Sequence, residues 1–250
     1  MDRKEFFDEC IRVFGENGIP LSGGEAELQK YFELASILVE TNKKMNLTAI
    51  TDMNGIIVKH FADSLKLLDH VKENDRSVAD IGCGGGFPIL PCAISASFRF
   101  PSLLFTGFDS TKKKVDHVNA CADALSLTNL SAVCGRAEDL AKAEEYRERF
   151  DVGTARAVSE QYILSELCLP FIKVGGRMIA LKGAKGKDEL SFAKAHMKEL
   201  GAGDISLYEY ELFGGPVPEY RCIIESSKVC ATKKAYPRQY AKILSEAKKG

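Results

Sequence analysis

The sequence has neither an excess of charge of one sign nor a long apolar run. Its 250 residues include 34 lysines and arginines against 35 aspartates and glutamates, a formal net charge of -1. Bulk charge therefore does not indicate a nucleic-acid-binding protein, and any basic surface must be local. No apolar stretch is long enough to span a membrane, so we expect no transmembrane helix. The chain is charged from its second residue onward, and we expect no signal peptide.

Patterns typical of metal sites and disulfides are also missing. The four histidines show no ligand spacing among themselves, and we predict no metal site. The eight cysteines are scattered without a C-x-x-C pair, and most have apolar neighbours, which is typical of small core residues. No Ser-His-Asp set is evident. We therefore expect a cytoplasmic, reduced protein without disulfides.

Hydrophobic periodicity divides the chain into three parts. Residues 1–70 have the apolar spacing of helices and predict an N-terminal helical cap. In residues 71–227, strands alternate with helices, which predicts an α/β core with a mostly parallel sheet and helices on both faces. Its two last strands are joined by a short loop and predict an antiparallel pair. One helix is expected over residues 159–176, closing on two glycines, with a strand over 177–183.

Residues 228–250 predict a basic C-terminal tail. Its cations outnumber its single acid, Glu246, and they form either a solvated surface or a phosphate-binding one. The cations are Lys228, Lys233, Lys234, Arg238, Lys242, Lys248 and Lys249.

The clearest chemical signal is the segment VADIGCGGGFPILP, residues 78–91, in which an apolar strand ends at a cluster of glycines. Crowded glycines let a backbone turn tightly against a ligand. A phosphate-binding P-loop would require a Lys-Ser or Lys-Thr pair after the glycines, and the dinucleotide fingerprint would require glycine at Phe87. Asp80, beside the loop, disfavours an anion. It suits a cationic ligand such as S-adenosylmethionine.

Two later strand ends carry further acids. Asp109 ends the second predicted strand, where a carboxylate can accept hydrogen bonds from both ribose hydroxyls of a nucleotide. It can equally cap the helix that follows. Residues 135–139 follow the third strand, and Glu138 lies either beside an adenine amino group or in a surface turn.

Together these segments resemble a known family. KKMNLTAI, HFADSL, DIGCGGGFPILP, RAED, FDVGTARAV and ALKG occur in the order and spacing of the RsmG methyltransferases, also called glucose-inhibited division protein B. The resemblance implies a Rossmann-like class I methyltransferase fold with S-adenosylmethionine as cofactor. It also implies methylation of guanine N7 in the 530 loop of 16S ribosomal RNA. The expected partner is this RNA or a precursor of the small ribosomal subunit, and we expect a monomer.

The resemblance also assigns roles to single residues. The cofactor-binding residues that it implies are Gly82, Gly84, Phe87, Asp109, Ala137, Glu138 and Arg156. A signature near the N-terminus is matched by Asn46, Leu47, His60, Asp63 and Ser64. The sequence departs from the family at Cys83, where serine or threonine is usual, and at Ile89, where glycine is usual. It also lacks the family's C-terminal Gly-Thr-Pro segment.

Arg156 and Lys182 are the candidate catalytic residues, because each ends a predicted core strand where the crevice opens. Either side chain can bind guanine O6 or a flanking phosphate and so position the N7 edge. Guanine N7 has a lone pair and no proton to lose, so alignment can supply most of the catalysis without a general base. His60 and Asp63 lie one helical turn apart. They form either a local surface pair or a link between the cap and the cofactor pocket.

Other functions also fit the sequence. The near-zero net charge is compatible with a methyltransferase that acts on a small molecule or a protein. A cofactor-binding ribosome assembly factor without catalysis and a dehydrogenase are further alternatives. The salt dependence of binding to a ribosomal RNA fragment separates an RNA enzyme from the first of these. A methyl-transfer assay tests the assembly factor without catalysis, and titration with nicotinamide cofactors tests the dehydrogenase.

Overall fold

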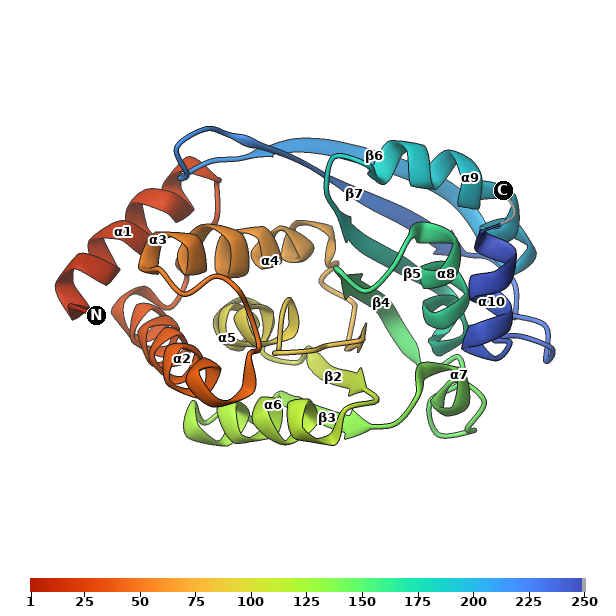
Figure 1. The fold of residues 1–250 in the computed structure, drawn as a ribbon, viewed down its shortest axis with the longest axis horizontal. Coiled ribbons are helices and arrows are strands. Elements are labelled where there is room, and N and C mark those ends of the chain that lie inside the picture. Colours follow the sequence, from red (N-terminus) through yellow and green to blue (C-terminus); the bar gives the residue numbers. More distant parts are fainter. Residues whose placement is uncertain (249–250) are drawn as a thin grey trace.

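The computed structural model describes residues 1–248, and within them a seven-stranded sheet forms the centre of the molecule (Figure 1). The strands lie in the order β3-β2-β1-β4-β5-β7-β6. Their bounds are β1 (Ser77–Ile81), β2 (Leu104–Asp109), β3 (Leu130–Cys134), β4 (Phe150–Arg156), β5 (Ile172–Lys182), β6 (Ala202–Leu212) and β7 (Glu219–Lys228). The first five pair in parallel, and β7 pairs antiparallel with both β5 and β6. The expected mostly parallel sheet with an antiparallel pair at its end is confirmed.

Successive side chains of the strands contribute to two separate hydrophobic clusters. Val78 of β1 and Ile179 of β5 belong to one cluster, whereas their neighbours Ala79 and Ala180 belong to the other. Side chains alternate across a strand, so this division places one cluster on each face of the sheet. The central strands β1 and β4 are accordingly almost entirely buried, whereas the edge strand β3 is partly exposed.

Helices cover both faces of the sheet (Figure 1). The first cluster takes buried residues from the helical run of residues 53–70 and from α1 (Arg3–Glu16), α2 (Gly24–Met45), α5 (Ile89–Arg99) and α6 (Lys112–Ala124). Those that contribute to the second are α8 (Gln161–Cys168), α9 (Gly186–Glu199) and α10 (Tyr240–Ala247). A short helix, α7 (Ala137–Leu140), follows β3. The expected doubly covered sheet is therefore confirmed.

Residues 53–70 form one helical run of changing pitch. It consists of α3 (Met53–Gly55), the π-helix η1 (Ile56–Ala62), α4 (Asp63–Leu65) and the 3₁₀ helix η2 (Lys66–His70). Asp52 caps its first turn, since the carboxylate accepts a hydrogen bond from the Gly55 amide at 2.7 Å. π-turns are frequent at functional sites, and this one carries His60.

The boundary between α8 and β5 differs from the expectation of a helix up to residue 176. The helix ends at Cys168, the 3₁₀ helix η3 (Leu169–Phe171) follows, and β5 already begins at Ile172. Pro170 lacks the amide hydrogen that a continuing α-helix needs. Ile172 pairs instead with Phe150 of β4, and the register of the two strands shifts beyond this pair. The glycines that were expected to close the helix therefore lie within the strand.

Two cations of the expected basic tail lie inside the protein. Lys228 is 1% exposed and donates to the carbonyl of Leu169 and the hydroxyl of Thr232. Arg238 binds the buried carboxylate of Glu166 and holds α10 against α8. Neither is available to bind a phosphate. Lys249, also counted in that tail, lies outside the described residues.

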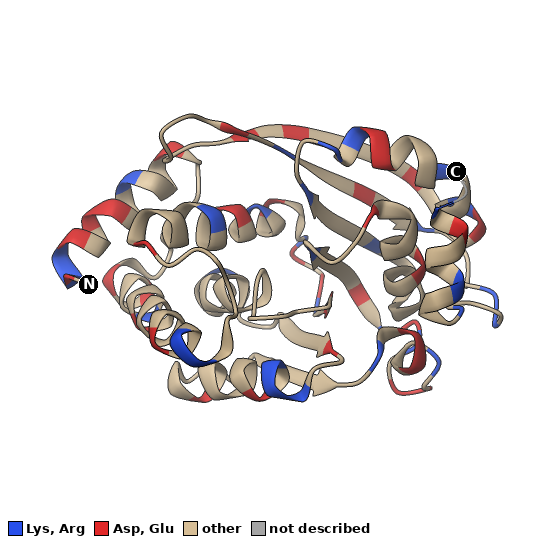
Figure 2. Cartoon of the chain, in the orientation of Figure 1, with Lys and Arg blue, Asp and Glu red and all other residues tan. Residues whose placement is uncertain are grey.

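Acidic and basic residues are interspersed along the ribbon, without a large region of one sign in this view (Figure 2). No helix among residues 1–248 is long and apolar enough to cross a membrane. The same residues contain no group of three or more histidine, cysteine, aspartate or glutamate side chains placed to hold a metal ion.

Candidate functional site

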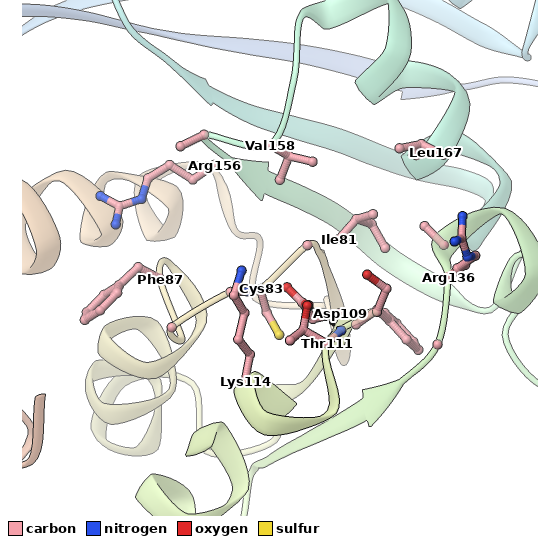
Figure 3. A pocket seen from close by; sticks show the side chains of 18 of the residues that line it. Ile81, Cys83, Phe87, Asp109, Thr111, Lys114, Arg136, Arg156, Val158 and Leu167 are labelled. Atoms are coloured by element: carbon pink, nitrogen blue, oxygen red, sulfur yellow. Dashed lines mark hydrogen bonds between the residues drawn. The ribbon is translucent and has the colours of Figure 1, made fainter. Parts of the chain in front are cut away.

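A cavity of about 600 Å³ opens at the carboxyl ends of the parallel strands (Figure 3). We call it the cofactor cavity. It lies where ligands bind in open α/β sheets, because loops from neighbouring strands diverge at this edge. The sequence-predicted residues that line it are Gly82, Gly84, Phe87, Asp109, Ala137, Glu138 and Arg156. The fold therefore brings all the expected cofactor-binding residues to one place.

The glycine loop after β1 forms the floor of the cofactor cavity. Gly82 has φ = 73°, and a Cβ built there would lie 2.7 Å from Val158 Cγ2. Gly84 also has a positive φ, of 54°, but the nearest atom to a Cβ there is 3.8 Å away. Glycine at 82 thus satisfies both a left-handed backbone and a close approach to the loop after β4.

Asp109 connects the glycine loop to the helix after β2. One carboxylate oxygen accepts from the Gly84 amide at 3.0 Å, and the other accepts from the Thr111 amide at 2.8 Å. The side chain thus caps the turn before α6 and also borders the cavity. A carboxylate offers about four acceptor positions, so each oxygen can still accept a ribose hydroxyl. The capping role and the expected ribose contact are compatible.

Asp80 is a buried acid directly before Ile81 and Gly82, which line the cofactor cavity, but it does not line the cavity itself. The residue is fully buried at the end of β1, and neither carboxylate oxygen has a hydrogen-bond partner among residues 1–248. Burial raises the pKa of Asp80 to about 7, although Arg156 opposes this shift. A buried acid without a partner is costly. The positive charge of S-adenosylmethionine in the neighbouring cavity would favour the ionised form of Asp80 through space, without direct contact.

This raised pKa predicts that cofactor binding depends on pH. A nearby cation favours the charged carboxylate, so affinity for S-adenosylmethionine should rise by up to about ten-fold from roughly pH 6 to pH 8. In the unliganded protein the sign is opposite, because the contribution of a raised pKa to folding stability is fully present below the unfolded value of 3.8 and is lost as the pH rises to about 7. Calorimetric titration of the wild type and Asp80→Asn tests this. The prediction is wrong if the difference between the two proteins is the same at every pH.

The adenine side of the cavity is formed by the turn after β3. Glu138 is 4% exposed, and its Oε1 atom is buried without a hydrogen-bond partner within the described chain. Ala137 lies beside it at the start of α7. Arg136 Nη1 lies 3.6 Å from this oxygen, beyond hydrogen-bonding distance, so the oxygen can still accept from the amino group of adenine. Tyr240 of α10 also lines the cavity, and the sequence analysis did not identify it.

Arg156 ends β4 and extends toward the helical run of residues 53–70, above Phe87 (Figure 3). Its Nη1 atom donates to the carbonyl of Lys59 at 2.6 Å and to the carboxylate of Asp63 at 3.0 Å. The guanidinium carbon lies 5.7 Å from the centroid of the Phe87 ring. These contacts fix the side chain at the border of the cavity and leave 13% of it exposed.

His60 and Asp63 link the N-terminal helices to the site, and the alternative of a local surface pair is wrong. Both are buried, and Tyr210 of β6 donates to Asp63 at 3.1 Å. The His60 ring stacks on Phe87 with 4.5 Å between the centroids. Burial, followed by the charge of Arg156, lowers the pKa of His60 to about 4. The imidazole is therefore neutral at pH 7.

Lys182 lies outside the cofactor cavity. It borders a second cavity of about 490 Å³, which shares His60, Arg156 and Ala157 with the first. Its Nζ atom donates to the Ser159 carbonyl and to Glu189, each at 2.8 Å. The two candidate catalytic residues thus lie on the wall of the second cavity, with Arg156 at the border between both.

Comparison with known proteins identifies the family. The family model GidB, described as rRNA small subunit methyltransferase G, matches residues 25–211. The chain belongs to this family.

Curated relatives agree over nearly the whole chain. The Ribosomal RNA small subunit methyltransferase G of Lysinibacillus sphaericus is 42% identical over 234 residues, which cover 92% of this chain and 94% of the relative. The protein of the same name from Leuconostoc citreum is 40% identical over 233 residues, with 92% and 93% covered. These matches confirm the resemblance and the methyltransferase activity that it implies.

Solved structures with the same fold are much more distant in sequence. An O-methyltransferase of Bacillus cereus in complex with SAH is 18% identical, with a TM-score of 0.53, and covers 78% of this chain and 91% of that one. A putative O-methyltransferase of Klebsiella pneumoniae is 11% identical, with a TM-score of 0.51 and 78% and 90% covered. The class I methyltransferase fold is confirmed. The cofactor of this methyltransferase is S-adenosylmethionine.

The two departures from the family pattern fill space beside the loop. The Cys83 side chain is 1% exposed. Its Sγ atom packs so closely on Gly107 of β2 that a Cβ built at Gly107 would lie 2.9 Å from it. Ile89 is also 1% exposed, in the first turn of α5. Burial raises the pKa of the Cys83 thiol, so it stays protonated. Both substitutions pack the loop against the sheet.

Proposed function

We propose that this protein transfers a methyl group to N7 of a guanine in the 530 loop of 16S ribosomal RNA. The names of the curated relatives and the family description support ribosomal RNA of the small subunit as substrate. The observation that carries the choice of a nucleophile such as N7 is that, among residues 1–248, none of those shared by the two cavities is a competent base.

The residues shared by the two cavities are His60, Arg156 and Ala157. His60 is a poor general base, because its pKa is about 4 and its Nε2 atom hydrogen-bonds to Thr48 at 2.8 Å. The guanidinium of Arg156 offers hydrogen-bond donors and no acceptor. Guanine N7 needs no deprotonation before it reacts. A hydroxyl substrate would have to lose a proton, and neither His60 nor Arg156 is suited to accept it.

The chain's own contribution is to hold and orient. S-adenosylmethionine, when bound, supplies an electrophilic methyl group on its sulfonium. Asp109 and Glu138 would hold the ribose and adenine, and the charge of Asp80 would favour the cationic end. Arg156, fixed by Asp63 and packed over Phe87, would position the base and exclude water. Orientation of this kind can lower a barrier by about 7–11 kcal/mol.

Mapping of modified nucleosides in 16S ribosomal RNA tests the proposal. RNA from cells that lack the protein should lose one N7-methylguanosine, and expression of the wild-type chain should restore it. An unchanged level of N7-methylguanosine contradicts the proposal.

We further propose that a single chain acts alone on an assembling particle, since one chain lines both cavities and the near-neutral surface suits weak binding to naked RNA. Equal methylation of naked RNA and assembling subunits contradicts the choice of particle.

A further inference from the structure

The pair Glu189 and Lys182 lies in the second cavity, outside the cofactor cavity. Lys182 ends β5, and Glu189 lies in the first turn of α9. One oxygen of Glu189, Oε2, accepts from Lys182 Nζ at 2.8 Å and from the Gln161 amide at 3.0 Å. The other oxygen, Oε1, accepts no hydrogen bond from residues 1–248. The pair therefore presents a free acceptor next to an ammonium group.

This arrangement matches one purine and opposes the other. Guanine presents two donors, N1–H and the 2-amino group, beside the acceptor O6. Adenine presents the acceptor N1 beside the donor 6-amino group. RNA-binding proteins read such edges on unstacked bases. We propose that Glu189 is a specificity-determining residue that reads the Watson–Crick edge of the target guanine, with Oε1 facing N1–H and the 2-amino group, while Lys182 donates to O6.

The position of the second cavity supports this assignment, which rests on the proposed function. The wall that it shares with the cofactor cavity contains Arg156 and His60. In guanine, O6 lies between N1 and N7, so a base held at Glu189 and Lys182 directs its N7 side away from them and toward this wall. The side chains of Lys182 and Glu189 are 8% and 22% exposed. In such partly desolvated surroundings, an unmatched polar group on the base is penalised more than it is in water.

Glu189→Gln is the informative substitution. Lys182 and Gln161 both donate to one oxygen, so the amide oxygen should take that place. The amide NH₂ then replaces Oε1 and turns a donor toward the donors of guanine. Asp188→Asn is the matched control, because Asp188 lies in the same helical turn and is exposed. Melting temperatures of both variants verify that they fold.

The test compares 30S subunits reconstituted with 16S ribosomal RNA that carries either guanosine or inosine at the methylated position. Inosine lacks the 2-amino group and keeps N7 and O6. The wild type should methylate guanosine with a kcat/KM about ten-fold above inosine. Glu189→Gln should bring this ratio to about one, mainly by losing activity on guanosine, and Asp188→Asn should keep the wild-type ratio.

The outcomes separate this assignment from the proposed function. Equal losses on both substrates would mean that Glu189 acts only by holding Lys182, and would overturn the assignment. A wild-type protein that does not distinguish the two substrates would overturn it as well. In both cases N7 methylation of guanosine itself continues, and the proposed function stands. A wild-type protein that methylates neither RNA at N7 would overturn the proposed function and this assignment with it.

Discussion

Alanine at position 82 should weaken the binding of S-adenosylmethionine by about 100-fold, whereas alanine at position 84 should weaken it by about ten-fold or less. Both glycines have a positive φ, which costs a side chain about 1–3 kcal/mol. Only at Gly82 does the added Cβ also collide with Val158, at 2.7 Å. Relief of this clash requires the loop to move away from the geometry that forms the floor of the cofactor cavity.

The comparison of Gly82→Ala with Gly84→Ala separates backbone strain from the clash. Calorimetric titration gives the two dissociation constants, and melting curves with and without the cofactor show how much of the strain remains in the unliganded protein. Equal losses of affinity in the two variants would mean that contact with Val158 has no part in the effect. The double variant Gly82→Ala with Val158→Ala should recover part of the lost affinity, because the smaller side chain leaves room for the Cβ.

The glycine loop was predictable from the sequence because its signal is local. Four glycines follow a buried strand. No Lys-Ser or Lys-Thr pair follows them, which disfavours a P-loop, and Phe87 stands where the dinucleotide fingerprint requires glycine. Asp109 was predictable for a similar reason, since the carboxyl ends of parallel strands meet at the edge of the sheet where ligands bind. The boundary of β5 was less accessible. A run of apolar residues suits a helix and a buried strand equally, and only pairing with β4 decides between them.

Residues brought in by distant segments could not be predicted. Tyr240 reaches the cofactor cavity because Arg238 fixes the start of α10 on Glu166 of α8. No motif near Tyr240 signals this. Glu189 meets Lys182 only after α9 folds back onto the sheet. For His60 and Asp63 the helical spacing was visible, but their partners are on β4 and β6, so the sequence left two interpretations open.

Replacement of Arg156 by alanine should lower kcat/KM for the small-subunit RNA substrate by about 100-fold, the loss that a small misplacement of reacting groups can cause. Cofactor affinity should change little, because the other predicted cofactor-binding residues are unchanged and Arg156 donates its hydrogen bonds to Lys59 and Asp63. The same substitution removes the ion-pair partner of Asp63, whose side chain is only 9% exposed. Tyr210 and Arg221 still face Asp63, so we expect a loss of about 3 kcal/mol in the free energy of unfolding.

The double variant Arg156→Ala with Asp63→Asn distinguishes a functional arginine from a structural one. Removal of the carboxylate's charge removes the reason for the instability, so the double variant should be more stable than Arg156→Ala alone. Its methyl transfer should stay low, because the group that positions the base is still missing. Urea unfolding and single-turnover methylation measure the two quantities on the same samples. Recovery of activity together with stability would show that Arg156 serves only as the partner of Asp63. Recovery of stability alone would place Arg156 in the machinery that orients the guanine.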